Sequence, residues 1–188
     1  MNEINFLEKY QKSTTRDYVE RVVKHDKAEC ASKAKNWGFD YWDGERQYGY
    51  GGYKYDGRWK AIAEDIAKHY GLKAGDKVLD IGCGKGFLLY ELSQVVPGLE
   101  VTGIDISSYA IENAKEEIKD KLQVSNCTKL PFADNTFDFV YSINTFHNLS
   151  IEQLEQAIQE MERVGKKSKW CCIESYRDEK EKANLLYW

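Results

Sequence analysis

The feature that most constrains this chain is a run of three glycines at alternate positions, which directly follows a short apolar segment. Residues 78–86 read VLDIGCGKG, and apolar side chains then recur at helical spacing through residue 95. Glycine lets a backbone turn tightly and approach a ligand without an intervening β-carbon. A buried strand that turns through glycines into a helix predicts the start of a parallel α/β unit.

The same alternation of short apolar runs and amphipathic segments continues to residue 174. We expect strands at residues 77–81, 99–104, 122–125, 137–143 and 169–174, with helices at 58–70, 87–95, 107–118 and 150–164. Ser107 or Ser108 suits the start of one helix, and Ser150 with Gln153 forms a capping box for the last. This order predicts an α/β fold with a Rossmann-like, doubly wound and mostly parallel sheet that carries helices on both faces.

The first 59 residues depart from this pattern. Residues 14–37 are charged, with apolar side chains at a spacing that favours one or two helices, and residues 37–59 read WGFDYWDGERQYGYGGYKYDGRW. The glycines in the second stretch argue against a regular element there. We therefore divide the chain into an N-terminal helical and aromatic, glycine-rich lid segment (1–59) and a compact core unit (60–188).

Charge and cysteine usage narrow the class of partner. The 31 acidic and 27 basic side chains give a formal net charge of −4, which argues against a nucleic acid as the main partner. No apolar run reaches the roughly 18 residues that span a bilayer, and the N-terminus lacks the apolar stretch of a secretion signal. Five cysteines without a CxxC pair indicate a reducing, cytoplasmic setting. No acidic cluster follows the fourth strand, so we expect no metal.

Ligands of such sheets bind at the carboxyl ends of the strands, where the chain order reverses. The glycine run lies at the end of the first predicted strand, and Asp105 ends the second, 19 residues after Gly86. A carboxylate at that place can accept hydrogen bonds from both hydroxyls of a ribose. A dinucleotide-binding loop has a G-x-G-x-x-G spacing, which this chain does not keep, so an NAD-dependent dehydrogenase is the weakest alternative.

The segment from residue 77 to residue 174 resembles class I S-adenosylmethionine-dependent methyltransferases. VLDIGCGKGFLLYEL is similar to the D-x-G-x-G-x-G motif of that family, and LPF at residues 130–132 also follows its pattern. The resemblance implies S-adenosylmethionine as cofactor, with S-adenosylhomocysteine as product. It implies cofactor contacts from Asp80, Gly82, Cys83, Gly84, Gly86, Asp105, Ile106, Asn126, Cys127 and Asn144. In that family an aspartate is commoner at the position of Asn126, and this difference affects how strongly adenine would be recognised.

Two residues in the loop after the fourth strand are candidates for the reaction. His147 is our candidate for a general base, and Asn144 at the strand end is our candidate for orienting the acceptor. In the aromatic segment, Tyr48, Tyr50, Tyr53, Arg58 and Trp59 are candidates for a lid over the cofactor or for acceptor contacts. Packing without a role in binding or catalysis is the alternative for each of these residues.

The acceptor itself stays open at this point. Modest size, acidic balance and aromatic segment favour methyl transfer to an oxygen or nitrogen of a small molecule, such as a sugar, a nucleotide-linked metabolite or a surface-glycan precursor. The alternatives are an RNA or protein methyltransferase and a catalytically silent cofactor-binding subunit. The family usually adds a helix and a strand pair after the fifth strand, whereas this sequence ends 14 residues beyond Glu174. We therefore expect either a longer natural protein or a homodimer that covers the edge of the fifth strand.

Overall fold

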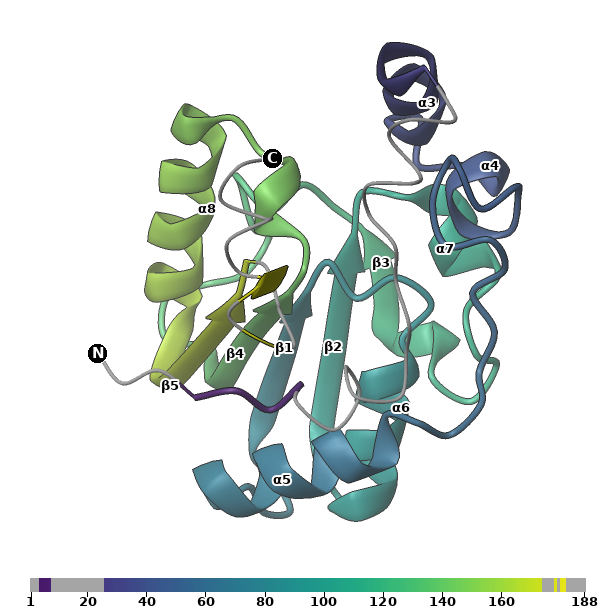
Figure 1. The fold of residues 1–188 in the computed structure, drawn as a ribbon. Coiled ribbons are helices and arrows are strands. Elements are labelled where there is room, and N and C mark those ends of the chain that lie inside the picture. The colour runs from purple at the N-terminus through teal and green to yellow at the C-terminus, as the bar shows by residue number, and fades with distance from the viewer. Residues whose placement is uncertain (1–3, 8–25, 174–177, 179, 182–188) are drawn as a thin grey trace.

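Five parallel strands form one sheet in the computed structural model, which describes residues 4–7, 26–173, 178 and 180–181 (Figure 1). The spatial order is β3-β2-β1-β4-β5, so the chain order reverses between β1 and β4. Ligands bind at such a reversal in open α/β sheets. The strands are β1 (Lys77–Ile81), β2 (Glu100–Asp105), β3 (Leu122–Val124), β4 (Phe137–Ile143) and β5 (Gly165–Cys172).

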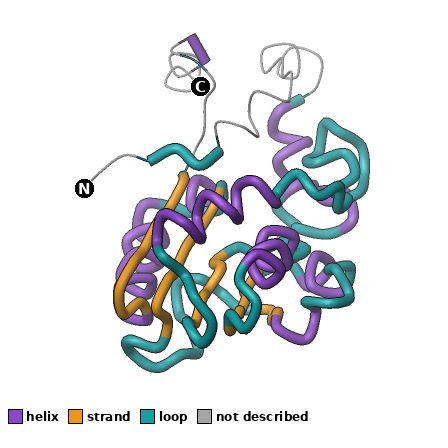
Figure 2. Tube along the Cα trace, turned by 90° about the horizontal axis from the view of Figure 1, so that it is seen from below, coloured by secondary structure: helices purple, strands orange, loops and turns teal. Residues whose placement is uncertain are grey.

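Helices cover both faces of this sheet. The helices are α3 (Lys27–Ala34), α4 (Phe39–Trp42), α5 (Lys60–Tyr70), α6 (Phe87–Val95), α7 (Ser108–Glu112) and α8 (Ile151–Val164). Two 3-10 turns, η1 (Lys119–Lys121) and η2 (Phe146–Asn148), lie in the connections. Figure 2 shows the strands as a layer with helices on either side, and in Figure 1 α3 and α4 lie beyond the carboxyl end of β2.

The alternation of side chains along β1 explains why both faces are covered. Val78 points to the face where it packs with Ile62 and Ile66 of α5, and Leu79 points to the opposite face, where it meets Met161 of α8. Both strand residues are fully buried. Burying a valine or leucine side chain contributes roughly 1.5–3 kcal/mol, so both helix layers are held on the sheet by its own strands. The doubly wound parallel fold is therefore confirmed.

Most element boundaries agree with the sequence, and the caps agree in detail. Ser107 accepts a hydrogen bond from the Ala110 N–H, and Ser150 with Gln153 forms both bonds of the capping box. The predicted helix from residue 107 to 118 is wrong in length, because α7 ends at Glu112. Turns and η1 carry the rest of that connection. One or two helices were predicted over residues 14–37, and residues 14–25 of that stretch lie outside the described part of the chain.

The fifth strand begins four residues earlier than the sequence suggested. It starts at Gly165, directly where α8 ends, and its first five residues read GKKSK. β5 lies at one end of the described sheet, so its lysines can reach water and acidic neighbours. Lys167 pairs with Asp138 at 2.8 Å and Lys169 pairs with Glu162 at 3.0 Å. These charged side chains interrupt the apolar pattern, so the pattern alone does not indicate the start of an edge strand.

Candidate cofactor site

The glycine run forms a tight loop between β1 and α6, and the backbone of β2 holds it. The Gly82 and Cys83 N–H groups both donate to the Ile104 carbonyl, at 2.8 and 2.9 Å. Gly82 and Gly84 have φ values of +84° and +54°, in the left-handed region that favours glycine. The position of a β-carbon on Gly82 would fall 2.0 Å from the Thr145 hydroxyl, so only glycine fits against the loop after β4.

Asp105 joins the end of β2 to this loop. One carboxylate oxygen accepts the Gly84 N–H at 2.8 Å, and the other accepts the Ser107 N–H at 2.8 Å. The side chain is buried, and this burial raises the pKa of Asp105, although the backbone hydrogen bonds act in the opposite direction. Each carboxylate oxygen can accept further bonds, so Asp105 can hold the loop and still bind hydroxyl groups of a ligand.

Asp80 lies beneath the loop, in the middle of the sheet. Burial, with a smaller contribution from the negative charge of Asp105, raises the pKa of Asp80 to about 8, and the nearby Tyr141 hydroxyl acts the other way. The Tyr141 hydroxyl is itself buried and meets no acceptor with hydrogen-bond geometry. The raised pKa favours the uncharged form of Asp80 at neutral pH, and Asp105 is the acid that lines the cavity described next.

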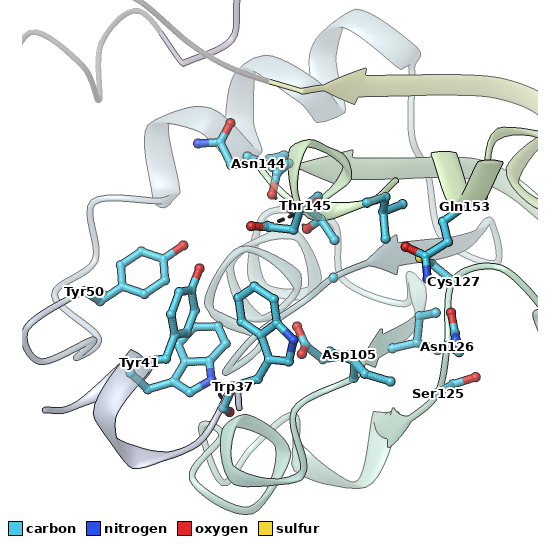
Figure 3. A pocket seen from close by; sticks show the side chains of 17 residues that line it. Trp37, Tyr41, Tyr50, Asp105, Ser125, Asn126, Cys127, Asn144, Thr145 and Gln153 are labelled. Carbon is cyan, nitrogen blue, oxygen red and sulfur yellow. Dashed lines mark hydrogen bonds between the residues drawn. The ribbon is translucent and has the colours of Figure 1, made fainter. Parts of the chain in front are cut away.

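A cavity of about 240 Å³ opens where β1, β2 and β4 end (Figure 3). It is lined by Trp37, Tyr41, Trp42, Tyr50, Gly82, Ile104, Asp105, Ile106, Ser125, Asn126, Cys127, Ile143, Asn144, Thr145, Asn148, Leu149 and Gln153. In Figure 3 the rings of Trp37, Tyr41 and Tyr50 stand on one side, and residues 125–127 stand on the opposite side. Asn144 and Thr145 close a third side, and the Tyr41 and Tyr50 hydroxyls point in their direction.

The aromatic side of the cavity is built from α4 and the glycine-rich segment after it. We call Trp37, Tyr41, Trp42 and Tyr50 the aromatic wall. Trp42 and Tyr50 stack with an interplanar angle of 9° and centroids 5.2 Å apart, and Tyr41 meets both rings edge-on. The Trp42 indole N–H donates to the Ser107 hydroxyl at 2.9 Å. The wall is therefore fixed to the same serine that Asp105 holds.

The structure brings most of the predicted cofactor residues to this cavity. Gly82, Asp105, Ile106, Asn126, Cys127 and Asn144 line it, together with Tyr50 of the predicted lid. The Cys83 side chain is buried in the core, so a contact from this residue to a ligand would come from its backbone. The roles of these residues, and of Asp80, Gly84 and Gly86 beside them, remain predictions.

Asn126 has a local partner that the sequence did not indicate. Its side-chain oxygen accepts the Thr128 N–H at 2.9 Å and the Thr128 hydroxyl at 3.0 Å. Recognition of adenine by Asn126 would need the same oxygen to accept a bond from the adenine amino group. An amide oxygen has two lone pairs, and Thr128 uses both, so that contact requires the short turn at residues 126–128 to rearrange.

Five other predicted residues lie outside the lining of the cavity. His147 Nδ1 lies 3.0 Å from the Ile173 carbonyl, and the Tyr48 hydroxyl accepts a bond from Lys33 at 2.9 Å. Tyr53 stacks on Phe87. Arg58 pairs with Asp56, and Trp59 packs against the hydrophobic core. Their proposed roles in catalysis or in a lid stay predictions.

Several residues of the cavity were not predicted from the sequence. Trp37, Tyr41 and Trp42 belong to the aromatic segment, but the lid candidates identified from the sequence all lie after position 47. Thr145, Asn148 and Gln153 follow β4, within the loop and helix start that include His147. The signal for the second group was available, because every residue just after a strand of a parallel sheet is close to the ligand edge.

These features define a class of protein: a doubly wound α/β domain that binds a nucleoside-containing cofactor at the switch point of its sheet. A glycine loop, a strand-end acid and an apolar side chain at Ile106 are the parts that such a ligand needs. Within the described residues, no three His, Cys, Asp or Glu side chains gather into a metal-binding group. No helix of that part of the chain is long and apolar enough to cross a membrane.

Comparison with known proteins gives the family. The family model described as a methyltransferase domain matches residues 79–173, half of the chain. The chain therefore belongs to the class I S-adenosylmethionine-dependent methyltransferase family, and S-adenosylmethionine is the cofactor that this membership implies. The residues present fit that cofactor, because Asp105 can accept from ribose hydroxyls and the aromatic wall offers ring faces to a sulfonium cation.

Two curated relatives and two solved structures illustrate the similarity. A sterol 24-C-methyltransferase of Gibberella zeae is 38% identical over 108 residues, 53% of this chain and 28% of the relative. A demethylmenaquinone methyltransferase of Symbiobacterium thermophilum is 32% identical over 128 residues, 63% of this chain and 50% of the relative. The chain thus spans half or less of the length of these relatives.

The PH0226 protein of Pyrococcus horikoshii is 29% identical, with a TM-score of 0.52 over 68% of this chain and 58% of that one. The cyclase SpnF is 25% identical, with a TM-score of 0.50 over 60% of this chain and 45% of its own.

Proposed function

We propose that this protein transfers the methyl group of S-adenosylmethionine to an oxygen or nitrogen of a small molecule, such as a sugar, a nucleotide-linked metabolite or a surface-glycan precursor. One observation supports it most strongly. The ends of β1, β2 and β4 bring the glycine loop, Asp105 and Asn144 to one cavity, and residues 125–127 complete its far side. These are the places from which a parallel sheet can hold a nucleoside and present its reactive end to a second molecule.

When bound, the cofactor supplies a methyl group on a sulfonium, which is already activated for in-line displacement. The chain then has to position two molecules and accept a proton. Asp105 would accept from the ribose hydroxyls, and Ile106, whose side chain is 54% exposed at the cavity, would pack against the base. Asn144 would orient the acceptor, because it directly follows β4 and lines the same cavity.

His147 is the proposed base for an acceptor that carries a proton. Its Nδ1 lies within hydrogen-bond distance of the Ile173 carbonyl, at 3.0 Å. A carbonyl can only accept, so this contact favours the tautomer that is protonated on Nδ1 and has its lone pair on Nε2. Nε2 is then the atom that would take the proton from an acceptor in the cavity, which the neighbouring Thr145 and Asn148 line.

The aromatic segment would act as a lid that closes the cavity. Trp37, Tyr41, Trp42 and Tyr50 already form one of its sides. An aromatic wall excludes water and suits both the sulfonium and an acceptor with an apolar face. The two curated relatives are named for sterol and demethylmenaquinone substrates, which supports a small-molecule acceptor. The name of the sterol enzyme specifies carbon, so carbon acceptors belong in the test beside oxygen and nitrogen.

A second candidate function is cofactor binding without methyl transfer. The similarity to SpnF, a cyclase by name, is the observation that favours it. An RNA or protein acceptor is a third possibility, and the acidic balance of the chain disfavours RNA.

Turnover with methyl-labelled S-adenosylmethionine separates these functions. The protein would be incubated with panels of sugars, nucleotide sugars, amines, quinols and sterols, and with total RNA and a protein lysate. We expect label in a small molecule, and expect His147→Ala to slow transfer to protonated acceptors. Label in RNA or protein would overturn the small-molecule proposal. Cofactor binding with no labelled product from any panel would favour the silent subunit.

A further inference from the structure

Lys85, in the middle of the glycine loop, has its ammonium group buried. Its side chain is 6% exposed, although lysine is rarely buried in proteins. The ammonium donates to both carboxylate oxygens of Asp43, at 2.9 and 2.7 Å, and to the Tyr53 carbonyl at 2.9 Å. All three N–H bonds are therefore used within the protein. The charge of Lys85 is neutralised by Asp43 rather than presented to a ligand.

Asp43 accepts hydrogen bonds from three separate segments. It follows α4 directly and, besides Lys85, accepts the Tyr109 hydroxyl of α7 at 2.8 Å and the Tyr53 N–H at 3.1 Å. Burial alone would raise the pKa of Asp43, but the hydrogen bonds from Lys85, Tyr109 and Tyr53 outweigh it and lower the pKa below its usual value. Asp43 is therefore ionised at neutral pH, and the ion pair is complete.

The ion pair is adjacent in sequence to a second contact between the same two segments. Trp42 precedes Asp43, and Gly84 precedes Lys85. The β-carbon position of Gly84 lies 2.7 Å from the Trp42 ring, so the indole rests directly on the loop. Trp42 also lines the cavity and stacks with Tyr50. The ion pair thus holds the aromatic wall at a fixed distance from the glycine loop.

We propose that Lys85 and Asp43 form a latch that positions Trp42 and the aromatic wall over the glycine loop, and that this latch sets how slowly the cofactor leaves. Lys85 is a positioning residue in this scheme and does not contact the cofactor. Removing one partner of a buried ion pair leaves the other charge uncompensated, so losing either Lys85 or Asp43 should release this contact. The inference rests on the proposed function only in requiring that the cavity binds the cofactor.

The test compares four variants with the wild type: Lys85→Met, Asp43→Asn, the double variant and Lys167→Met. Lys167 is a matched control, because it pairs with Asp138 beside the opposite end of the sheet. Binding and dissociation of S-adenosylhomocysteine are measured by calorimetry and stopped flow. Hydrogen exchange of residues 38–53 is measured without ligand, so that the latch is followed even in a protein that does not bind the cofactor.

If losing the latch leaves the wall in place about one-tenth of the time, the dissociation constant rises about tenfold. We expect that rise from each single variant through a faster off-rate, with faster exchange in residues 38–53. The double variant should be no weaker than the worse single variant, since both lose one interaction. Lys167→Met should leave binding and exchange unchanged.

Unchanged exchange in residues 38–53, or additive effects in the double variant, would overturn the latch. If Lys85→Met does not fold, Tyr109→Phe removes a single bond to Asp43 and should give the same effects in smaller size; no change there would also overturn it. The wild type could fail to bind S-adenosylhomocysteine while the Lys85 and Asp43 variants still speed hydrogen exchange in residues 38–53. That result would contradict the proposed function and the effect on cofactor release, and would leave only the structural link between Lys85, Asp43 and the aromatic wall.

Discussion

Replacing Gly84 with alanine tests the contact between the glycine loop and the aromatic wall. Two costs follow from the structure. The backbone at Gly84 has a φ of +54°, and an alanine in the left-handed region costs about 1–2 kcal/mol. The new methyl group would also lie 2.7 Å from the Trp42 ring, so the indole has to move. Moving it endangers its 2.9 Å hydrogen bond to Ser107, whose loss costs about 1 kcal/mol more.

Gly71→Ala separates the two costs. Gly71 has a φ of +61° at the end of α5, and no atom lies within 4 Å of its β-carbon position. This control therefore measures the backbone cost alone. We expect urea unfolding to show a loss of about 1–2 kcal/mol for Gly71→Ala and about 2–3 kcal/mol for Gly84→Ala. Only Gly84→Ala should weaken binding of S-adenosylhomocysteine.

Trp42→Leu in the Gly84→Ala background should recover part of the stability, because a smaller side chain relieves the contact. If Gly71→Ala and Gly84→Ala lose equal stability and bind S-adenosylhomocysteine equally well, Trp42 does not press on the loop at Gly84. Simple addition of the effects of Gly84→Ala and Trp42→Leu would likewise rule out this contact.

Three further predictions follow from single residues. The pKa of Asp80 is about 8 in the folded state and roughly 3.9 in an unfolded chain, so its protonation stabilises the fold fully below about pH 4, and this contribution is lost as the pH rises through 8. In urea titrations Asp80→Asn should therefore lose less stability than the wild type between pH 6 and 8. An unchanged dependence of the unfolding free energy on pH would contradict a buried proton on Asp80. Ser150→Ala removes the capping box of α8 and should cost about 1 kcal/mol in thermal or urea unfolding, and an unchanged unfolding free energy would contradict the role of the cap. A β-carbon on Gly103 would lie 2.6–2.8 Å from Leu122, Leu89 and Cys83, so Gly103→Ala should cost about 1–3 kcal/mol by overpacking; a neutral effect would mean that the core beneath the loop is loosely packed.

The core of the fold could be predicted because its signals are local. The β1 strand and the helix after it are apolar runs separated by glycines, and Asp105 follows from its distance to that loop. Each of these elements is read within about twenty residues of sequence. The parallel order then follows from the alternation of strands and helices, since parallel strands need a crossover between them.

The parts that escaped prediction depend on contacts between distant segments or on polar edge positions. The partners Asp43 and Lys85 are 42 residues apart, and nothing in a glycine-rich aromatic stretch fixes where Trp42 will pack. The start of β5 was missed because its lysines find acidic partners at the edge of the sheet, so the apolar signal appears only in its second half. Local pattern reasoning finds a cofactor loop more readily than the segment that covers it.

The cavity at the ends of β1, β2 and β4 should bind S-adenosylmethionine through Asp105. Calorimetric titration of the full chain with S-adenosylhomocysteine measures this binding, with NAD as a competing ligand and Asp105→Ala beside Lys167→Met as variants. We expect one binding site for S-adenosylhomocysteine, retained in Lys167→Met and lost in Asp105→Ala, and no binding of NAD. If a folded Asp105→Ala variant binds S-adenosylhomocysteine as well as the wild type does, Asp105 does not hold the cofactor.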